Sequence, residues 1–206
     1  MESFIITIDR EIIWEYFQFY KKTNPKIRSF EFATKITERL YLPNGEPQLT
    51  SGGKQKTKRR KRRLHEITKD DMLYGVMSLN ELLVIGNRMT MNGIKKKYGK
   101  LGLWLADKYG LTNKQYSNSV MEYRVFKHTK AKADLDNISA GIKILNDGLC
   151  VESKAFIDDN YNHINPLLIG IEIDKEHPRT EIRVSIIDDK IKDIYEKMEI
   201  HKNNFK

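Results

Sequence analysis

The sequence predicts an α+β fold in which helices pack on a small mixed β-sheet. Short runs rich in β-branched and aromatic residues predict strands at 119–126, 166–174 and 180–187. Apolar residues recur at helical spacing in 88–109 and again in 138–149, which predicts two helices. The succession of these elements along one stretch of chain is what indicates the α+β class.

The predicted helix at 88–109 has an apolar stripe and a lysine-rich polar side. Gly93, Gly99 and Gly102 argue against its continuity, because glycine is unfavourable inside a helix. Gly110 is expected to end it as a C-cap. A strand at 72–78 is expected to precede this helix.

The last part of the chain is expected to contain a hairpin and a terminal helix. The segment 175–179 separates two strand-like runs and predicts a hairpin turn between them. Asp188 and Asp189 then precede a run with helical spacing, and negative charge at that place suits a helix N-terminus. The sequence therefore predicts a C-terminal helix or tail at 189–206.

The first part of the chain gives weaker signals. Residues 4–8 read as a strand, and the aromatic run at 12–20 fits a strand or a helix equally. Residues 29–40 predict a helix, because five apolar residues share one helical face and Ser29 can cap it. The aromatic side chains of this part are expected to form core or a docking surface.

Composition predicts one moderate domain with an appendage. The chain has 206 residues, of which 39% are hydrophobic, enough for one core. We expect an N-terminal extension at 1–69 that includes a basic linker at 54–63, a core at 70–188, and the tail. A single cysteine, Cys150, excludes an intramolecular disulfide framework. No signal peptide is recognised, so a cytoplasmic location is expected.

A strongly positive charge predicts a polyanionic partner. The formal net charge is +9, a balance that membrane surfaces and RNA would satisfy as well as DNA. Basic residues concentrate in one run that lacks apolar periodicity, is expected to be mobile, and predicts phosphate contacts that weaken as salt rises. A nuclear-localisation-like stretch and a solvated loop are the alternatives. The run comprises Lys54, Lys56, Lys58, Arg59, Arg60, Lys61, Arg62 and Arg63.

Two carboxylates stand one residue apart where a strand gives way to a helix. In extended chain Asp134 and Asp136 project to the same side, with Leu135 on the other. Their mutual repulsion would be relieved by a divalent cation. The alternative is that Asp136 or Asn137 caps the following helix while the other carboxylate is solvated.

A second acidic pair, Asp158-Asp159, follows about twenty residues later. Mg²⁺ takes oxygen ligands, often one or two carboxylates with substrate phosphate oxygens and water. Asp134 and Asp136 with one member of this pair would make such a site. The alternative is ordinary turn chemistry, to which Asp-Asp-Asn is well suited.

These motifs resemble the RusA-type Holliday-junction resolvases over about residues 70 to 188. The resemblance rests on Asp134-Leu-Asp136-Asn137 before a helix and Ile157-Asp158-Asp159-Asn160 after it. The run from Ile173 to Ile182 is similar to the end of phage-type members, and Ser78-Leu79-Asn80 to a motif near the family's first strand. The resemblance implies a RusA-like core.

The resemblance also implies site residues. Asp134, Asp136 and Asp159 correspond to metal-binding aspartates, with Asp158 beside them, and the metal would be Mg²⁺ or its substitute Mn²⁺. The family's lysine, four residues after the second aspartate, is replaced here by Ala140. Lys143 lies one turn further along the same face and is the candidate to replace it. Its alternative is a solvated helix lysine.

The activity implied is resolution of Holliday junctions by a homodimer in DNA recombination and repair. Paired nicks would leave 5′-phosphates, and the location would be the cytoplasm of a bacterial or phage-infected cell. Lys130 and Lys132 flank the first acidic pair and are expected to steady it or to meet DNA phosphate.

Three other functions fit parts of the pattern. A non-catalytic basic nucleic-acid-binding protein would use its aspartates structurally. A metal nuclease acting on duplex or flap DNA would differ in substrate alone. A nucleotide-sugar transferase also uses Asp-x-Asp, but the net charge and the basic run argue against it.

Overall fold

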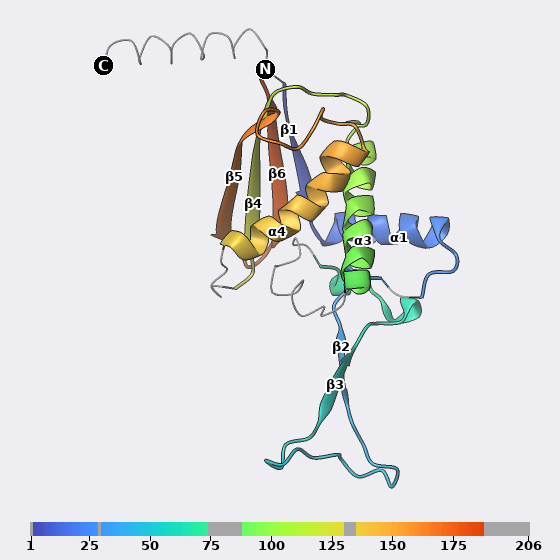
Figure 1. Cartoon of the computed structure of the whole chain (residues 1–206). Coiled ribbons are helices and arrows are strands. Elements are labelled where there is room, and N and C mark those ends of the chain that lie inside the picture. The colour runs from blue at the N-terminus through green and yellow to red at the C-terminus, as the bar shows by residue number, and fades with distance from the viewer. Residues whose placement is uncertain (1, 29, 74–87, 130–134, 188–206) are drawn as a thin grey trace. The chain divides into compact units, whose positions relative to one another are not determined.

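The computed structural model describes residues 2–28, 30–73, 88–129 and 135–187 (Figure 1). Inside the helices, the side chains at 88–91, 136 and 137 also lie outside this description. The chain divides into two compact units, the first formed by Met1–Asp9 and Gly75–Lys206, the second by Arg10–Tyr74. This division differs from the predicted boundary at residue 69, because the first strand belongs to the first unit.

The first unit is built on a four-stranded mixed sheet, which confirms the predicted α+β class. Its strands are β1 (Glu2–Ile8), β4 (Ser119–Lys127), β5 (Ile164–Ile173) and β6 (Arg179–Ile186), in the order β1-β6-β4-β5. β4 is parallel to β5 and antiparallel to β6, and β1 is antiparallel to β6. Alternate residues of β4 are buried, as expected of a strand with one face on a core.

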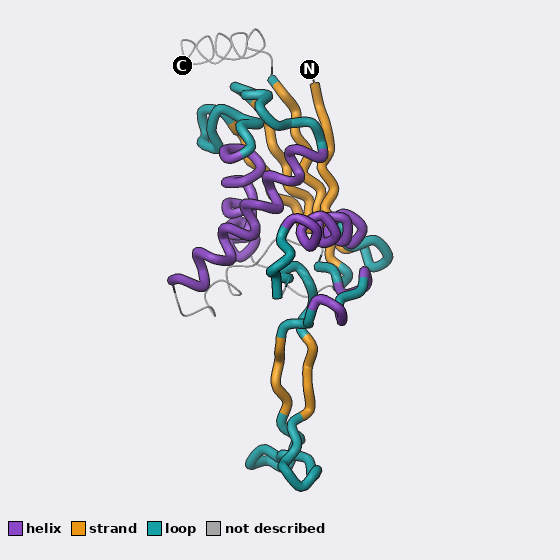
Figure 2. Tube along the Cα trace, turned by 90° about the vertical axis from the view of Figure 1, so that its right-hand side faces the viewer, coloured by secondary structure: helices purple, strands orange, loops and turns teal. Residues whose placement is uncertain are grey.

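Helices α3 (Arg88–Lys108) and α4 (Leu135–Asn146) cover one face of this sheet (Figure 2). The predicted stripe of α3 is confirmed, because Ile94, Tyr98, Leu101 and Leu105 are buried. Its predicted end is confirmed as well: Gly110 has a φ of +68° and the Leu111 amide donates to the Ala106 carbonyl at 2.8 Å.

Helix α4 continues into a single π-helical segment, η3 (Asp147–Glu152). The buried side of α4 presents Ile138, Ile142 and Leu145 to the sheet, as predicted. Cys150 of η3 is fully buried in the same core. The turn 153–163 then leads from η3 into β5.

The predicted hairpin between the last two strands is wrong. β5 and β6 both pair with β4, which lies between them, so the segment 174–178 crosses over the end of β4. Within this crossover the Asp174 carboxylate accepts the amides of Glu176 and His177, at 3.2 and 2.9 Å, and pairs with Arg179 at 2.7 Å. The backbone amides of this short polar connection are thus hydrogen-bonded within the connection itself, although the strands that it joins are not neighbours in the sheet.

The second unit starts with α1 (Arg10–Thr23), so the ambiguous aromatic run at 12–20 is helical. Ile13, Tyr16 and Phe17 are buried at helical spacing. Phe30 and Phe32 pack on this helix, with 4.8 Å between the ring centres of Phe17 and Phe30. These aromatic side chains form the core of the unit, and burial raises the pKa of the Tyr16 phenol.

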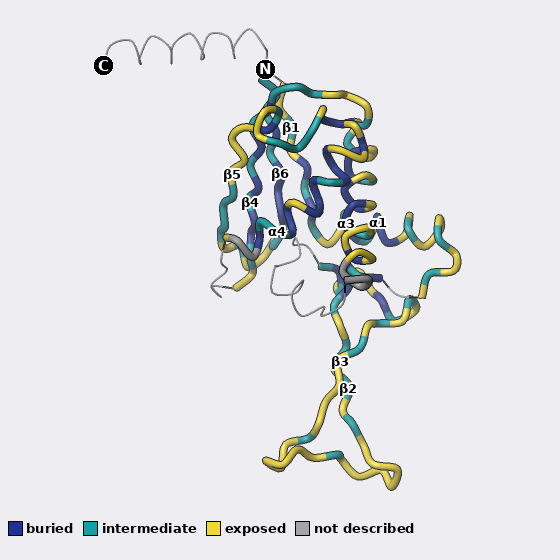
Figure 3. Tube along the Cα trace, viewed as in Figure 1, coloured by how far each residue is buried: buried dark blue, intermediate teal, exposed yellow. Residues whose placement is uncertain are grey.

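The predicted helix at 29–40 is wrong, because part of it forms a strand that pairs with part of the basic run. β2 (Ile36–Arg39) pairs antiparallel with β3 (Thr57–Arg60). Phe30, Phe32 and Ala33 enter the core of the second unit, but from residue 34 the side chains alternate between exposed and half-buried. We call residues 34–63 the arm; Figure 3 shows that most of it is exposed.

Acidic residues hold the base of the arm. The Arg60 guanidinium pairs with Glu38 and donates two hydrogen bonds to the Glu66 carboxylate, at 2.7 and 2.8 Å. Arg62 pairs with Asp71 at 2.7 Å, and Lys61 with Glu31 at 2.7 Å. Hydrogen bonds from Arg60 and from the Arg63 amide lower the pKa of Glu66 to about 2.

This depressed pKa predicts that acid loosens the base of the arm. The ordinary pKa of Glu66 is 4.5, so its contribution is complete above that pH and is lost as the pH falls through about 2. NMR cross-strand contacts between Thr37 and Arg59 are expected to weaken across this range. In Glu66→Gln they should already be weak at neutral pH. Contacts that persist unchanged in that variant would show that Glu66 does not hold the arm.

Candidate active site

The predicted acidic motif lies at the carboxyl end of β4, within a β-α-β unit. β4 ends at Lys127, α4 begins at Leu135, and β5 returns parallel to β4. Asp134, Lys130 and Lys132 lie outside the described residues. Asp136 lies in the first turn of α4, inside the helix, and not at the cap position that was predicted for it. Negative charge in a first turn is favoured by the helix dipole.

Lys143 joins α4 to the second acidic pair. Its ammonium nitrogen lies 2.5 Å from Oδ2 of Asp159 and 3.3 Å from Oδ1 of Asp147. Asp159 is only 10% exposed, whereas 63% of the Lys143 side chain is exposed. The hydrogen bond to Asp159 raises the pKa of Lys143, so this lysine stays protonated at neutral pH. Lys143 is thus both ion-paired and largely exposed to solvent.

The two members of the acidic pair have different surroundings. Asp158 folds the turn: one oxygen accepts the Asp159 amide at 2.8 Å and the other accepts the Asn160 side-chain amide at 2.7 Å. These hydrogen bonds lower the pKa of Asp158. Asp159 instead points at Lys143. The geometry therefore favours Asp159 over Asp158 as a ligand for a cation.

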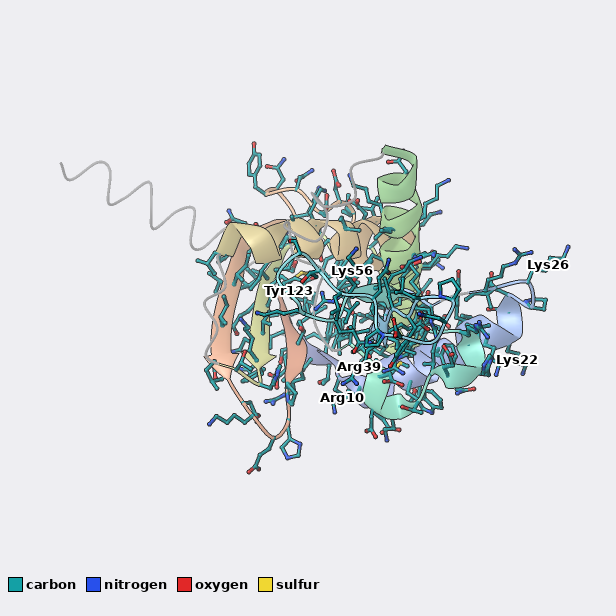
Figure 4. All side chains as sticks on the ribbon, turned by 90° about the horizontal axis from the view of Figure 1, so that it is seen from below. Arg10, Lys22, Lys26, Arg39, Lys56 and Tyr123 are labelled. Atoms are coloured by element: carbon teal, nitrogen blue, oxygen red, sulfur yellow. The ribbon has the colours of Figure 1, made fainter. Side chains whose placement is uncertain are left out.

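A buried layer lies under this pair. Tyr123 of β4 is fully buried and its hydroxyl donates to the Asn146 side chain (Figure 4). Burial raises the pKa of Tyr123, and the charge of Asp159 adds to that shift. Burial also raises the pKa of the Cys150 thiol, again with a contribution from Asp159. Both groups stay protonated at neutral pH, so neither supplies a nucleophile.

Helix geometry limits how the two acidic motifs can share an ion. Position 136 precedes Lys143 by two turns, about 10 Å along the axis. The contact with Asp147 places the Lys143 ammonium, and with it Asp159, toward the C-terminal half of α4. No cluster of three or more metal-ligating side chains occurs among the described residues, a set that excludes the side chains of Asp134 and Asp136.

Asp147 is the member of this cluster that the sequence pattern missed. It lies four residues after Lys143 on α4 and η3, at a spacing that brings side chains together on a helix. That spacing was the available signal. Its contact with Lys143 also ties the start of η3 to the acidic turn.

A pocket of about 280 Å³ lies in the first unit beside the acidic turn. Tyr161 and His163 follow Asp159 in the chain and line this pocket with side-chain amides from two other segments. Amide and imidazole groups of this kind hydrogen-bond the edges of nucleobases, and an exposed tyrosine stacks on their faces. The lining residues are Asn118, Ser119, Tyr161, Asn162, His163, Asn165 and Ile187.

The basic run divides into two groups in the structure. Arg60, Lys61 and Arg62 pair with acidic residues at the base of the arm. The other five are exposed and form no ion pair within the described part of the chain. These are Lys54, Lys56, Lys58, Arg59 and Arg63.

No family model, curated protein or solved structure matches this chain. The resemblance to RusA-type resolvases therefore stays a prediction from the motifs. Among the described residues, no helix is both long and apolar enough to cross a membrane.

Proposed function

We propose that this protein is a metal-dependent endodeoxyribonuclease that cuts branched DNA. The observation that carries the proposal is the contact between Lys143 and Asp159. It links the second acidic pair to the helix whose first turn holds Asp136, although 23 positions separate the two aspartates in the sequence. A protonated lysine and cation-binding carboxylates from two segments are the groups that phosphodiester cleavage needs.

The chemistry follows from the charges of this cluster. Asp134, Asp136 and Asp159 would hold Mg²⁺, or Mn²⁺ in its place, because carboxylate oxygens are the ligands that these ions prefer. The ion would supply an activated water to attack the phosphorus and would offset charge on the leaving 3′-oxygen. The products would be a 3′-hydroxyl and a 5′-phosphate. Lys143, protonated at neutral pH, would offset charge on the phosphate. Asp158 would keep Asp159 in position through the turn.

The four-way junction is the substrate that the motif resemblance favours. A homodimer would place two sites on opposing strands, and a two-fold protein suits a nearly two-fold substrate. Paired nicks would then resolve the junction. This dimer is part of the proposal and rests on the resemblance alone.

The second candidate is a basic nucleic-acid-binding protein without catalytic activity. The observation that favours it is that Asp159 already has a cationic partner in Lys143, so this carboxylate has a counter-charge without a metal. In that case the aspartates would serve only to stabilise the fold.

Incubation of a synthetic junction, a matched duplex and a flap with Mg²⁺ separates these functions. We expect paired nicks at the junction, with ends that DNA ligase can reseal, and no cleavage in the presence of a chelator. Binding without cleavage in both Mg²⁺ and Mn²⁺ would favour the second candidate. Cleavage of the duplex or the flap at the same rate as the junction would support a nuclease but exclude specificity for the junction.

Replacing Lys143 by methionine tests its role. We expect cleavage to fall by about 10- to 100-fold, because a positive charge near the phosphate is lost. We also expect less Mg²⁺ to be needed for half-maximal rate, because the ammonium no longer competes for Asp159. Lys100→Met, which removes an exposed lysine of α3, is the matched control. An unchanged rate and metal dependence in Lys143→Met would exclude Lys143 from the site.

A further inference from the structure

The arm carries most of the net charge of the chain. Residues 34–63 contain ten basic and two acidic residues, so they account for +8 of the formal +9. One of the two acids, Glu38, is already paired with Arg60. Such a concentration of charge on a two-stranded element is costly in isolation, because the cations repel one another. A polyanion removes that cost.

Seven of the ten cations are available to such a partner. They are exposed and form no ion pair within the described part of the chain, unlike the three cations at the base. The ion pairs at the base fix the arm to the second unit, so the remaining cations are held on an ordered support. The seven are Lys35, Arg39, Lys54, Lys56, Lys58, Arg59 and Arg63.

The pairing of β2 with β3 places these cations on both faces of the ribbon. Thr57 pairs with Arg39 and Arg59 with Thr37, so the two arginines share one face. Lys58 alternates to the other face. Two strands lie about 5 Å apart, and with side chains such a ribbon fits the B-DNA major groove, which is about 12 Å wide. Cations on both faces would then meet phosphates on both walls of the groove.

The tip of the arm exposes three large apolar side chains. Tyr41, Leu42 and Leu49 are 57%, 42% and 51% exposed. They lie in two short hairpins whose backbone is hydrogen-bonded, as between the Leu42 amide and the Glu46 carbonyl at 2.8 Å. Gly45 and Gly53 allow the two turns, with φ values of +86° and +73°. Figure 2 shows the tip as a branched end beyond the two strands.

Exposed apolar groups next to cations match DNA in which base stacking is interrupted. Continuous duplex presents its phosphates but hides the faces of its bases, whereas a branch point exposes some of them. Apolar side chains inserted at such a step gain contact area that a continuous duplex does not offer.

We propose that the arm binds branched DNA in two parts. Its cationic stem, which carries Lys54, Lys56, Lys58 and Arg59, lies in the major groove of one duplex. The exposed apolar side chains of its tip, Tyr41, Leu42 and Leu49, contact unstacked bases at the branch. This inference rests on the proposed function for the identity of the polymer, but it requires no cleavage. It also excludes double-stranded RNA as the preferred partner, because the major groove of A-form RNA is too deep and narrow for such a ribbon.

Two variants of the full-length protein test the stem, with binding measured without divalent metal so that no cleavage occurs. The stem variant replaces Lys54, Lys56, Lys58 and Arg59 by alanine. The matched control replaces Lys21, Lys22, Lys26 and Arg28, which are also exposed in the second unit; Figure 4 shows Lys22 and Lys26 extending outward from the end of α1. Circular dichroism of each variant should match that of the wild type, because these side chains are exposed.

The stem variant is expected to flatten the dependence of log K on log salt by up to about 3.6, at about 0.9 per phosphate contact, on junction and duplex alike. The control is expected to keep the wild-type slope. An unchanged slope in the stem variant, or equal flattening in both variants, would overturn the role of the stem. Double-stranded RNA bound as tightly as duplex DNA would overturn the groove assignment.

The tip variant replaces Tyr41, Leu42 and Leu49 by serine. We expect it to lower affinity for the junction by about tenfold and for the duplex by less than about twofold, because only the branch exposes base faces. Equal losses on both substrates would overturn the role of the tip. These binding results are independent of catalysis. If the wild-type protein cleaves no DNA but both variants show the expected losses in binding, the proposed nuclease activity is refuted and the proposed role of the arm stands.

Discussion

Replacement of Asp159 by asparagine is expected to lower metal-dependent cleavage by about 100-fold or more, while DNA affinity is kept or improved. The reason is that a carboxylate is lost from the proposed site, which weakens metal capture and also reduces repulsion of phosphate. Asp136→Asn should behave in the same way. Cleavage rates at saturating protein, together with binding measured without divalent metal, check both effects. Full activity in either variant would refute the site.

Asp158→Asn is the matched control for this prediction. An asparagine at 158 can still accept the amide of Asp159, so it keeps one of the two hydrogen bonds of the turn and loses the charge and the bond from the Asn160 side chain. We expect cleavage to stay within about threefold of the wild type, in the range of ordinary turn substitutions. If Asp158→Asn lost activity and Asp159→Asn kept it, the assignment within the acidic pair would be reversed.

Replacement of Gly148 by alanine is expected to destabilise the first unit by about 3 kcal/mol or more. A Cβ at this position would lie 1.9 Å from the Gly99 carbonyl oxygen and 2.5 Å from the Gly99 carbonyl carbon, and neither atom belongs to a flexible side chain. Gly102 on α3 also lies close to η3, since its Cβ would be 2.6 Å from the Leu149 amide nitrogen. The two helical segments would have to separate. Urea unfolding measures the loss.

Gly93→Ala provides the control on the same helix. No heavy atom lies within 4 Å of the position of its Cβ, apart from the helix itself. Alanine there is expected to stabilise the protein by about 0.5–1 kcal/mol, because it restricts the unfolded chain and favours the helix. Equal stability of Gly148→Ala and Gly93→Ala would show that α3 and η3 are not in close contact.

The glycines of α3 show where a local rule failed. Their helix propensity argues against a continuous helix, yet α3 is continuous from Arg88 to Lys108. The energetic loss at Gly102 is offset by close packing against α4 and η3, which a larger side chain at that position would prevent. A propensity scale contains no information about that contact.

The sequence was most informative where one face of an element is buried. The stripe on α3, the alternation in β4 and the glycine that ends α3 all follow from local side-chain patterns. The failures at 29–40 and 175–179 have a common origin. In both places the partner of a strand decides the structure, and that partner is distant in sequence or is chosen by the order of the sheet.

Some features of the candidate site follow from the sequence, and others are seen only in the structure. Residue type and spacing indicate Asp136 and the acidic pair, whereas Lys143 is implied by the resemblance to RusA-type resolvases, in which a lysine stands where this chain has Ala140. The structure adds that Asp159 contacts Lys143 and that Asp158 is engaged in its own turn. Both findings depend on how η3 and the following turn return to α4.

The sequence by itself determined the kinds of element in the described part of the first unit, the places of the acidic motifs and the concentration of cations in one run. The predicted helix at 189–206 and most of the predicted strand at 72–78 lie outside the described residues. Only the tertiary structure decided the order of the strands, the folding of the cations into an arm and the choice of the carboxylate that faces Lys143. The physical reason is that periodicity and charge are properties of neighbouring residues. Strand pairing and ion pairing depend on which distant segments the packed core brings together.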